Sequence, residues 1–220
     1  MKKAIVLLSG GLDSTTTLYI ARHKGFDVHG LAFDYGQRHK KEIQAAKKVA
    51  QLACCPLKII KITLPWKGSS LLDKTLPLPL DKKIRKGIPS TYVPARNTIF
   101  LSFSLSYAEA IGASHIFIGA NDLDYSGYPD CRPRYYQAFN VLARLATKSG
   151  VEGKEIKIQA PLIGLTKSRI IKLGLKLGVP YEATWSCYKG AKLPCGHCDS
   201  CVLRAKGFRE AHAQDPLLKS

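Results

Sequence analysis

The sequence is poor in acidic residues and has no long apolar run. Only 16 aspartates and glutamates stand against 34 lysines and arginines, which gives a formal net charge of +18. No apolar run approaches the length of a membrane span. The apolar residues 4–8 are also too few for a signal peptide. We therefore expect a cytoplasmic protein without a membrane segment.

The basic charge has no nucleic-acid-binding motif beside it. Much of it is dispersed over pairs such as Lys40–Lys41 and Lys47–Lys48, and there is neither an RNA-binding signature nor an arginine-rich arm. Charge by itself indicates non-specific association rather than a reaction. A basic surface around a pocket for anionic nucleotides is therefore favoured, and RNA binding stays open as the alternative.

Apolar runs alternate with helical patterns along the 220 residues. Strands are expected at 4–8, 27–33, 57–63, 114–119 and 156–159, and helices at 14–24, 40–53, 93–111, 134–148, 167–177 and 198–213. This alternation predicts an α/β fold, a Rossmann-like parallel sheet with flanking helices whose ligands bind at the carboxyl ends of the strands. Residues 64–93 interrupt this alternation of strands and helices. We call them the excursion and interpret them as a lid or an oligomer contact. We expect a nucleotide-binding domain at 1–180 and a helical segment at 181–220.

A glycine turn joins the first strand to the first helix. Residues 9–14 read S-G-G-L-D-S. Such a turn directs the free N–H groups of the first helical turn at whatever lies at the strand's end, and phosphate or pyrophosphate is their natural ligand. The turn lacks both the lysine of a Walker loop and the spacing of a dinucleotide fingerprint.

The same residues resemble the signature of the PP-loop ATP pyrophosphatases. Those enzymes split ATP between the α and β phosphates and pass AMP to a substrate oxygen. Asp13 suits a role with magnesium or in fixing the backbone, because a carboxylate beside phosphates needs a cation between them. The resemblance implies a fold of the adenine-nucleotide α-hydrolase type.

Seven cysteines, an odd number, argue against a disulfide framework. Four of them, Cys187, Cys195, Cys198 and Cys201, follow the spacing C-x7-C-x2-C-x2-C. Four thiolates suit a closed structural zinc site, one Zn²⁺ per chain, which would fix a segment with little core of its own. An iron–sulfur cluster is the alternative, although no flavin or nicotinamide motif points to redox chemistry. His197 lies between the ligands and is not needed.

Three further motifs indicate which family of PP-loop enzymes this sequence resembles. Residues 33–39 read F-D-Y-G-Q-R-H, residues 93–97 read V-P-A-R-N, and residues 124–133 read D-Y-S-G-Y-P-D-C-R-P. With the cysteine pattern they resemble the 7-cyano-7-deazaguanine synthase family, in the same order from about Lys3 to Arg209. Members of that family often carry glycine where this chain has Ala95.

The resemblance implies an ATP-dependent carbon–nitrogen ligase. ATP, 7-carboxy-7-deazaguanine and ammonia would give 7-cyano-7-deazaguanine, a queuosine precursor, through adenylated intermediates. Mg²⁺ would accompany ATP. The substrate is a free base, so tRNA binding is not required, and a homodimer is expected.

The candidate residues fall into three overlapping groups. We expect ATP to contact Leu8, Ser9, Gly10, Gly11, Leu12, Asp13, Ser14, Thr15, Thr16, Thr17, Leu18, Tyr35, Gln37 and Arg38. The candidates for the deazaguanine are Arg96, Asn97, Asp124, Tyr125, Tyr128, Asp130 and Arg132, because carboxylates accept from its N–H groups and aromatic rings stack on it. Asp13, Ser14 and Arg96 are the catalytic candidates. A guanidinium matches carboxylate or phosphate oxygens in bidentate fashion.

Two other functions stay open at this point. A tRNA-modifying PP-loop enzyme, by sulfur transfer or lysidine-type ligation, would use the basic surface to bind RNA. Its sulfur-transfer form predicts a catalytic cysteine pair, for which Cys54 and Cys55 fit poorly because they lie at a helix end away from the carboxyl ends of the strands. A non-enzymatic zinc-bearing RNA-binding module would leave the glycine turn unexplained.

Overall fold

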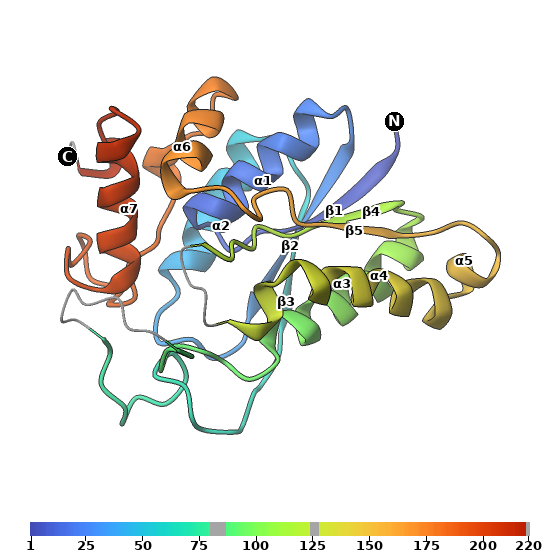
Figure 1. The fold of residues 1–220 in the computed structure, drawn as a ribbon, viewed down its shortest axis with the longest axis horizontal. Helices are drawn as coiled ribbons and strands as arrows, with labels where there is room; N and C mark the ends of the chain where they lie inside the picture. Colours follow the sequence, from blue (N-terminus) through green and yellow to red (C-terminus); the bar gives the residue numbers. More distant parts are fainter. Residues whose placement is uncertain (80–86, 124–127, 219–220) are drawn as a thin grey trace.

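A parallel sheet of five strands forms the centre of the structure, a computed structural model that describes residues 1–79, 87–123 and 128–218. The strand order is β3-β2-β1-β4-β5 (Figure 1). The strands are β1 (Lys3–Leu7), β2 (Asp27–Asp34), β3 (Leu57–Lys61), β4 (His115–Phe117) and β5 (Lys157–Gln159). The helices are α1 (Leu12–His23), α2 (Lys41–Leu52), α3 (Arg96–Ile111), α4 (Pro133–Ala146), α5 (Lys148–Val151), α6 (Lys167–Lys176) and α7 (Asp199–Glu210), with 3-10 turns η1 (Pro129–Cys131), η2 (Tyr181–Ala183) and η3 (Pro216–Leu218). Every strand pairing is parallel, so the predicted fold class is confirmed.

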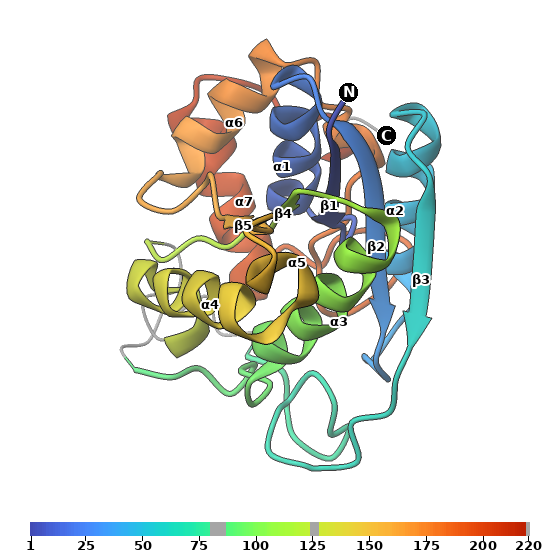
Figure 2. The same ribbon diagram turned by 90° about the vertical axis from the view of Figure 1, so that its right-hand side faces the viewer.

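The apolar run of β1 contributes to two cores at once. Ile5 and Leu7 belong to the core shared with α3 and α4, whereas Ala4, Val6 and Leu8 belong to the core shared with α1 and α2. Successive side chains of a strand point to opposite faces, and a parallel sheet is covered on both. Figure 2 shows α3, α4 and α5 together on one side of the strands. In the part of the chain that is described, no helix combines the length and apolarity needed to cross a membrane.

The carboxyl-terminal residues are fixed to α7 by a buried ion pair. The Nε and Nη2 atoms of Arg204 donate to the two carboxylate oxygens of Asp215 at 2.7 and 2.9 Å, and both side chains are 6% exposed. Arg204 also donates to Thr184 Oγ1 and to the carbonyl of Tyr181. All three nitrogens of this guanidinium therefore donate to groups within residues 181–215. The division of the chain at residue 180 stays a prediction.

The helix expected over 134–148 is interrupted at Thr147. This residue is extended, with φ −121° and ψ 150°, and its Oγ1 accepts from the N–H of Gly150 at 2.9 Å. A Cβ on Gly150 would lie 2.2 Å from the carbonyl oxygen of Arg144, so the chain can fold back closely only at a glycine. The capping threonine and the glycine together end α4 and start the short α5.

Ala95 holds a left-handed backbone conformation, with φ 52° and ψ 25°, at the start of α3. This conformation costs an L-residue about 1–2 kcal/mol, whereas glycine adopts it freely. We expect Ala95→Gly to raise the melting temperature by about 1–3 °C, because the relief of strain exceeds the extra entropy of the unfolded glycine. The matched control is Ala110→Gly, an exposed alanine inside the same helix, which should lower the melting temperature. Equal losses in both variants would contradict the interpretation.

Candidate functional site

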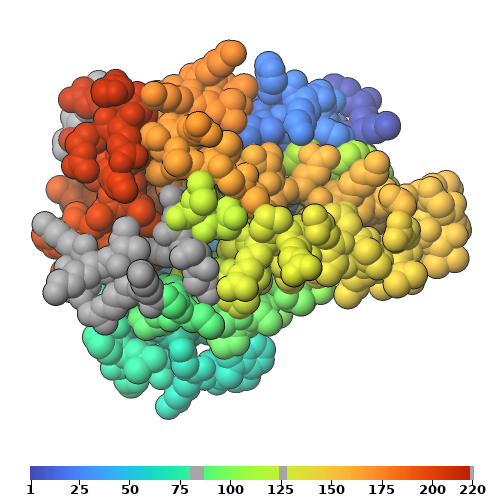
Figure 3. Space-filling model, viewed as in Figure 1, coloured from blue at the N-terminus to red at the C-terminus, as the bar shows by residue number. Residues whose placement is uncertain are grey.

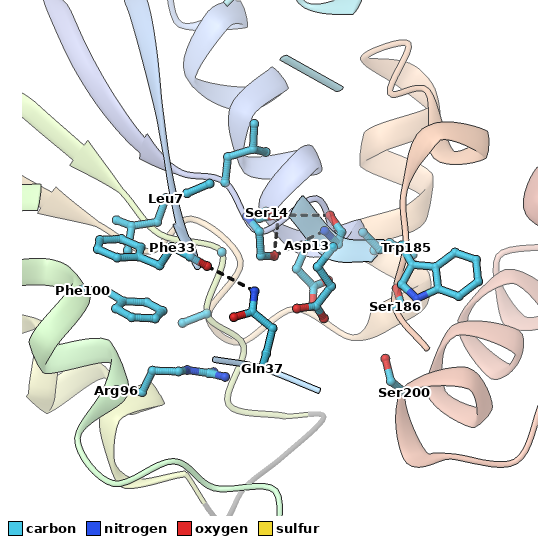
Figure 4. A pocket seen from close by; sticks show the side chains of 18 of the residues that line it. Leu7, Asp13, Ser14, Phe33, Gln37, Arg96, Phe100, Trp185, Ser186 and Ser200 are labelled. Atoms are coloured by element: carbon cyan, nitrogen blue, oxygen red, sulfur yellow. Dashed lines mark hydrogen bonds between the residues drawn. The ribbon is translucent and has the colours of Figure 1, made fainter. Parts of the chain in front are cut away.

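A cavity of about 300 Å³ lies at the carboxyl ends of the central strands. Ser9 follows β1, Tyr35 and Gln37 follow β2, and Asn121 follows β4, and all four line it. Side chains of α3 and of residues 185–204 complete the wall. Figure 4 shows Asp13, Gln37 and Arg96 facing this space. The sheet therefore places the ligand site where parallel α/β sheets usually have one.

The glycine turn begins α1 and lines the cavity at one end. Ser9 and Ser14 bond through their hydroxyls at 3.0 Å, and the Ser14 hydroxyl also receives the backbone N–H of Ser9. The helix has no side-chain cap at Gly11. The first N–H groups of α1 therefore lack partners within the helix, so they are suited to bind an anion.

Gly10 is required for the close packing of the glycine turn on α2, and its contact with ATP stays a prediction. Its φ is 81°, and a Cβ there would lie 2.4 Å from the backbone nitrogen of Ala46 in α2. Gly119, after β4, has the same function on the other side, where a Cβ would lie 2.9 Å from the backbone of Asp13. Both glycines let neighbouring backbones approach the turn, which fixes where α1 starts.

Asp13 forms an ion pair with a residue 154 positions away in the sequence. The ammonium of Lys167, at the start of α6, lies 2.8 and 2.7 Å from the two carboxylate oxygens. The lysine side chain is 12% exposed and the aspartate side chain 29%. The cavity thus contains a lysine ammonium beside its glycine turn. In a Walker loop the lysine belongs to the loop itself, whereas here Lys167 comes from a distant segment.

The predicted ATP residues divide into two sets. Those that line the cavity are Leu8, Ser9, Gly11, Leu12, Asp13, Ser14, Tyr35, Gln37 and Arg38. Thr15, Thr16 and Thr17 are fully buried, and their hydroxyls bond to carbonyls one turn back in α1 at 2.8, 2.8 and 2.9 Å. Leu18 is part of the core beside α2. The threonines and Leu18 hold the helix in place; contact of any of these residues with ATP stays a prediction.

Arg96 forms the opposite end of the cavity. It begins α3, and its Nη1 donates to the hydroxyl of Tyr35 at 3.4 Å. Burial foremost raises the pKa of Tyr35, against the lowering effect of the Arg96 charge. Phe33 and Phe100 stack beside them with ring centroids 4.0 Å apart. A guanidinium thus faces the cavity against an aromatic wall.

The other substrate candidates have different positions. Asn97 and Tyr128 line the cavity. Asp130 is buried, and its carboxylate accepts the N–H of Asn97 at 3.1 Å, so it caps α3 from another segment. Arg132 is exposed. Asp124 and Tyr125 lie outside the described residues, and the roles of all these residues stay predictions.

Arg38, predicted for ATP, lines the cavity and also binds the excursion. Its guanidinium donates to the carbonyls of Ser70, Asp73 and Leu76, the second of these at 2.8 Å. Residues 64–79 and 87–93 contain neither helix nor strand, and they form the lower part of the face in Figure 3. One cavity-lining side chain therefore attaches this irregular segment to the site.

Arg38→Ala should make the excursion accessible to protease. Hydrogen bonds to a charged group contribute about 1.5–3 kcal/mol each, so losing three of them should raise local opening at least roughly 10-fold. Trypsin should then cut faster at Lys67 and Lys74, as measured by timed digestion and mass spectrometry. Arg209→Ala, at an exposed arginine of α7, is the matched control. Unchanged cleavage in Arg38→Ala would show that other contacts hold the segment.

The four clustered cysteines meet at one point. Their sulfur atoms all lie within 4.8 Å of one another and could bind a metal ion, and His197 is outside the group. Backbone N–H groups of Lys189 and Cys195 donate to Cys187 Sγ at 3.4 and 3.3 Å. Such donors favour thiolates. Tetrahedral Zn–S bonds of about 2.3 Å would set the sulfurs roughly 3.8 Å apart, close to the 4.0 Å between Cys195 and Cys201.

This cysteine group is linked to the glycine turn through Trp185. The backbone N–H of Trp185 donates to the carbonyl of Gly10 at 2.9 Å, and its indole N–H donates to the carbonyl of Cys187 at 2.9 Å. A single residue therefore connects the metal-binding candidate to the phosphate-binding candidate.

The family model for queuosine biosynthesis protein QueC matches residues 3–212. The chain belongs to this family. It is 53% identical to a 7-cyano-7-deazaguanine synthase of Nostoc punctiforme over 221 residues, which are 98% of this chain and 99% of that protein. It is also 54% identical to a 7-cyano-7-deazaguanine synthase of Coxiella burnetii, over 98% of this chain and 97% of that protein.

Solved structures share the fold at low identity. NMN synthetase from Francisella tularensis aligns with a TM-score of 0.51 and 16% identity, covering 97% of this chain and 78% of that one. A 4-thiouridine synthetase in complex with RNA and ATP aligns with a TM-score of 0.50 and 19% identity, covering 94% and 53%. These likenesses concern the fold alone, and they confirm the type expected from the PP-loop resemblance.

Sequence reasoning missed two charged residues of this QueC-family site. Lys167 had been considered only as the first residue of a helix, although a lysine at a helix amino terminus opposes the macrodipole and is a signal in itself. Glu42 falls within the helix expected over 40–53, where no motif singles it out, yet it lines the cavity. Burial raises the pKa of Glu42 to about 7, against the lowering effect of Arg96. The sulfur-transfer candidates Cys54 and Cys55 are not among the cavity-lining residues.

Proposed function

We propose that this chain is a 7-cyano-7-deazaguanine synthase that converts 7-carboxy-7-deazaguanine, ammonia and ATP into the nitrile. One observation carries the proposal: a single cavity has a phosphate-binding helix start with Asp13 and Lys167 at one end and Arg96 at the other. The substrate's carboxylate suits the arginine, and the triphosphate suits the glycine turn. The names of the relatives support the same reaction.

The chemistry needs an activated acid. Ammonia does not displace oxide from a carboxylate, so a carboxylate oxygen first attacks the α phosphate of ATP and pyrophosphate leaves. Ser9, Ser14 and the first N–H groups of α1 would stabilise the charge on the departing pyrophosphate, and Lys167 would add its positive charge. Ammonia then replaces AMP and gives the amide.

A second adenylation at the amide oxygen would use the same residues. Loss of AMP and protons from that adduct leaves the nitrile. Both activations transfer AMP to an oxygen on the same carbon, so one glycine turn can serve both, and its contribution is positioning and charge stabilisation. Tyr128 and Asn97 would hold the deazaguanine ring during the exchange of leaving groups.

Mg²⁺ would accompany ATP at the glycine turn. It would be held by phosphate oxygens and by the Asp13 carboxylate. The carboxylate oxygens that accept from Lys167 still have lone pairs free to bind a cation. When bound, it neutralises charge on the phosphates. Zn²⁺ is the metal we propose for Cys187, Cys195, Cys198 and Cys201, because four sulfurs within 4.8 Å of one another would fill its four coordination positions.

The location and assembly are further parts of the proposal. A cytoplasmic enzyme fits a free-base substrate and ATP. A homodimer is supported by apolar side chains that α4 exposes: Val141 is 45%, Leu142 46% and Leu145 72% exposed. Such a surface is typical of a protein interface.

Measuring AMP formation tests the reaction directly. Purified protein should release AMP and pyrophosphate from ATP when 7-carboxy-7-deazaguanine and ammonium are present, with no tRNA added, and mass spectrometry should detect the nitrile. AMP formed only when tRNA is added would support a tRNA-modifying enzyme instead. Protein that binds no nucleotide would contradict both functions.

A further inference from the structure

Glu42 is a carboxylate of the cavity that the proposed contacts to ATP and deazaguanine leave unused. It stands in the first turn of α2. That turn packs directly on the glycine turn: a Cβ on Gly10 would lie 2.5 Å from the carbonyl oxygen of Glu42. The side chain therefore starts beside the phosphate-binding end and lines the same cavity.

The Glu42 carboxylate also lies close to the Arg96 end. The Arg96 charge lowers the pKa of Glu42, and the Glu42 charge contributes to the raised pKa of Tyr35, whose shift comes mainly from burial. Glu42 thus interacts with both groups of the substrate-facing wall. In the proposed reaction, the carbon that exchanges AMP for nitrogen must lie between the phosphates and Arg96. Glu42 lines the cavity that contains both ends and is affected by the charge of Arg96.

No protein side chain or backbone group pairs with this carboxylate in the described part of the chain. Within residues 1–79, 87–123 and 128–218 no hydrogen bond or ion pair reaches the Glu42 side chain, whereas Asp13 is held at both oxygens by Lys167. A half-buried carboxylate without a partner is costly, and its raised pKa reflects that cost. A small cation is the ligand that would relieve it.

We propose that Glu42 binds the ammonium ion and takes up its proton, so that ammonia is released beside the acyl adenylate. This inference rests on the proposed function. Ammonium gives one proton to Glu42, and the nitrogen lone pair forms the C–N bond. The C–O bond to AMP breaks with its electron pair, and a second proton leaves the nitrogen as the amide forms. One ammonium and one acyl adenylate thus give one amide, AMP and two protons.

The surrounding charges favour this assignment over a magnesium ligand. The titratable groups lining the cavity with Glu42 are Asp13, Tyr35, Arg38, His39, Arg96, Tyr128, Cys131, Lys167, Tyr188 and Arg204. Four of these side chains are basic, namely Arg38, Arg96, Lys167 and Arg204. Asp13 is the acidic member, placed at the glycine turn where phosphate-bound Mg²⁺ is expected. Glu42 is therefore the carboxylate that remains to bind the incoming ammonium ion.

The test compares Glu42→Gln and Glu42→Asp with wild type in two partial reactions. The first is pyrophosphate–ATP exchange driven by 7-carboxy-7-deazaguanine without ammonium, which reports adenylation alone. The second is nitrile formation with ammonium. We expect Glu42→Gln to keep exchange within about twofold and to lose at least roughly 100-fold in kcat/KM for ammonium, the size typical of a lost general base. Glu42→Asp should recover part of this loss.

Hydroxylamine and pH provide two further readouts. Hydroxylamine is uncharged at neutral pH, so Glu42→Gln should still capture the acyl adenylate as hydroxamate. In wild type, kcat/KM for total ammonium should rise with pH up to about 7, where Glu42 becomes ionised, and then level. Glu42→Gln should keep rising towards the pKa of ammonium itself, because only free ammonia can react.

Each outcome supports or overturns one statement. Wild type without pyrophosphate exchange overturns the proposed function and not specifically the role of Glu42. Normal exchange with unchanged ammonium kinetics in Glu42→Gln overturns the role of Glu42 alone. Loss of exchange together with a raised magnesium requirement would make Glu42 a magnesium ligand and likewise overturn the inference.

Discussion

Asp13→Ala is expected to reduce AMP formation by roughly 100- to 1000-fold, the cost of removing one group that stabilises developing charge in an active site. The carboxylate lies at the start of α1 and holds the ammonium of Lys167 at 2.7 Å. Without it, Lys167 loses its position and magnesium loses a carboxylate. The fold should persist because a partly exposed ion pair contributes about 1 kcal/mol or less. Circular dichroism and the melting temperature check this second point.

A double-mutant cycle separates the two roles of Asp13. If the aspartate acts only by positioning the lysine, Lys167→Ala and the double variant should lose as much activity as Asp13→Ala. If it also holds magnesium, Asp13→Ala should lose more, and added Mg²⁺ should restore part of it. Asp27→Ala, at a half-exposed carboxylate outside the cavity, is the control. Full turnover by Asp13→Ala would remove the aspartate from the mechanism.

Cys198→Ser is expected to lose the bound metal and to lower the melting temperature by more than about 10 °C. Cys198 is fully buried, and a structural zinc contributes about 10–16 kcal/mol to the folding of small zinc domains. Even a third of that would produce a shift of this size in a 220-residue chain. Elemental analysis should give one zinc per wild-type chain and none in the variant.

The same variant should also bind ATP more weakly. Trp185 joins Cys187 to the carbonyl of Gly10 through its two N–H groups, so loosening the metal segment releases one support of the glycine turn. Cys54→Ser changes an exposed thiol outside the cluster and should leave metal, melting and ATP affinity unchanged. Iron in place of zinc would point to a cluster, and full metal content with normal melting would contradict a structural site.

The sheet could be predicted from sequence because its signals are local. Residues 4–8 form a short apolar run bounded by a glycine turn, and the run matches β1 to within one residue at each end. The strand–turn–helix order fixed where the cavity would open. Thr147 shows where prediction from the local sequence fails. The pattern of residues 134–148 is compatible with one helix, but the close approach of the backbone at Gly150 ends that helix early.

The site could be predicted only in part because its charges come from distant segments. Ser9 to Ser14 form one continuous motif, so their position was evident. The pair of Asp13 and Lys167 is formed by tertiary folding across 154 positions. Arg38 sits in a family motif, yet its donors point to the carbonyls of the excursion. A sequence motif thus predicts which residues lie near the site, whereas tertiary packing determines which group each side chain binds.

The buried pair of Arg204 and Asp215 bears on how the protein is handled in the laboratory. Asp215 is five positions from the final residue, so an affinity handle or a trimmed terminus there would act on the anchor of α7. Met1 is 94% exposed and precedes β1 by two positions. Purification tags are therefore better fused ahead of Met1, which leaves the opposite end of the polypeptide as it is.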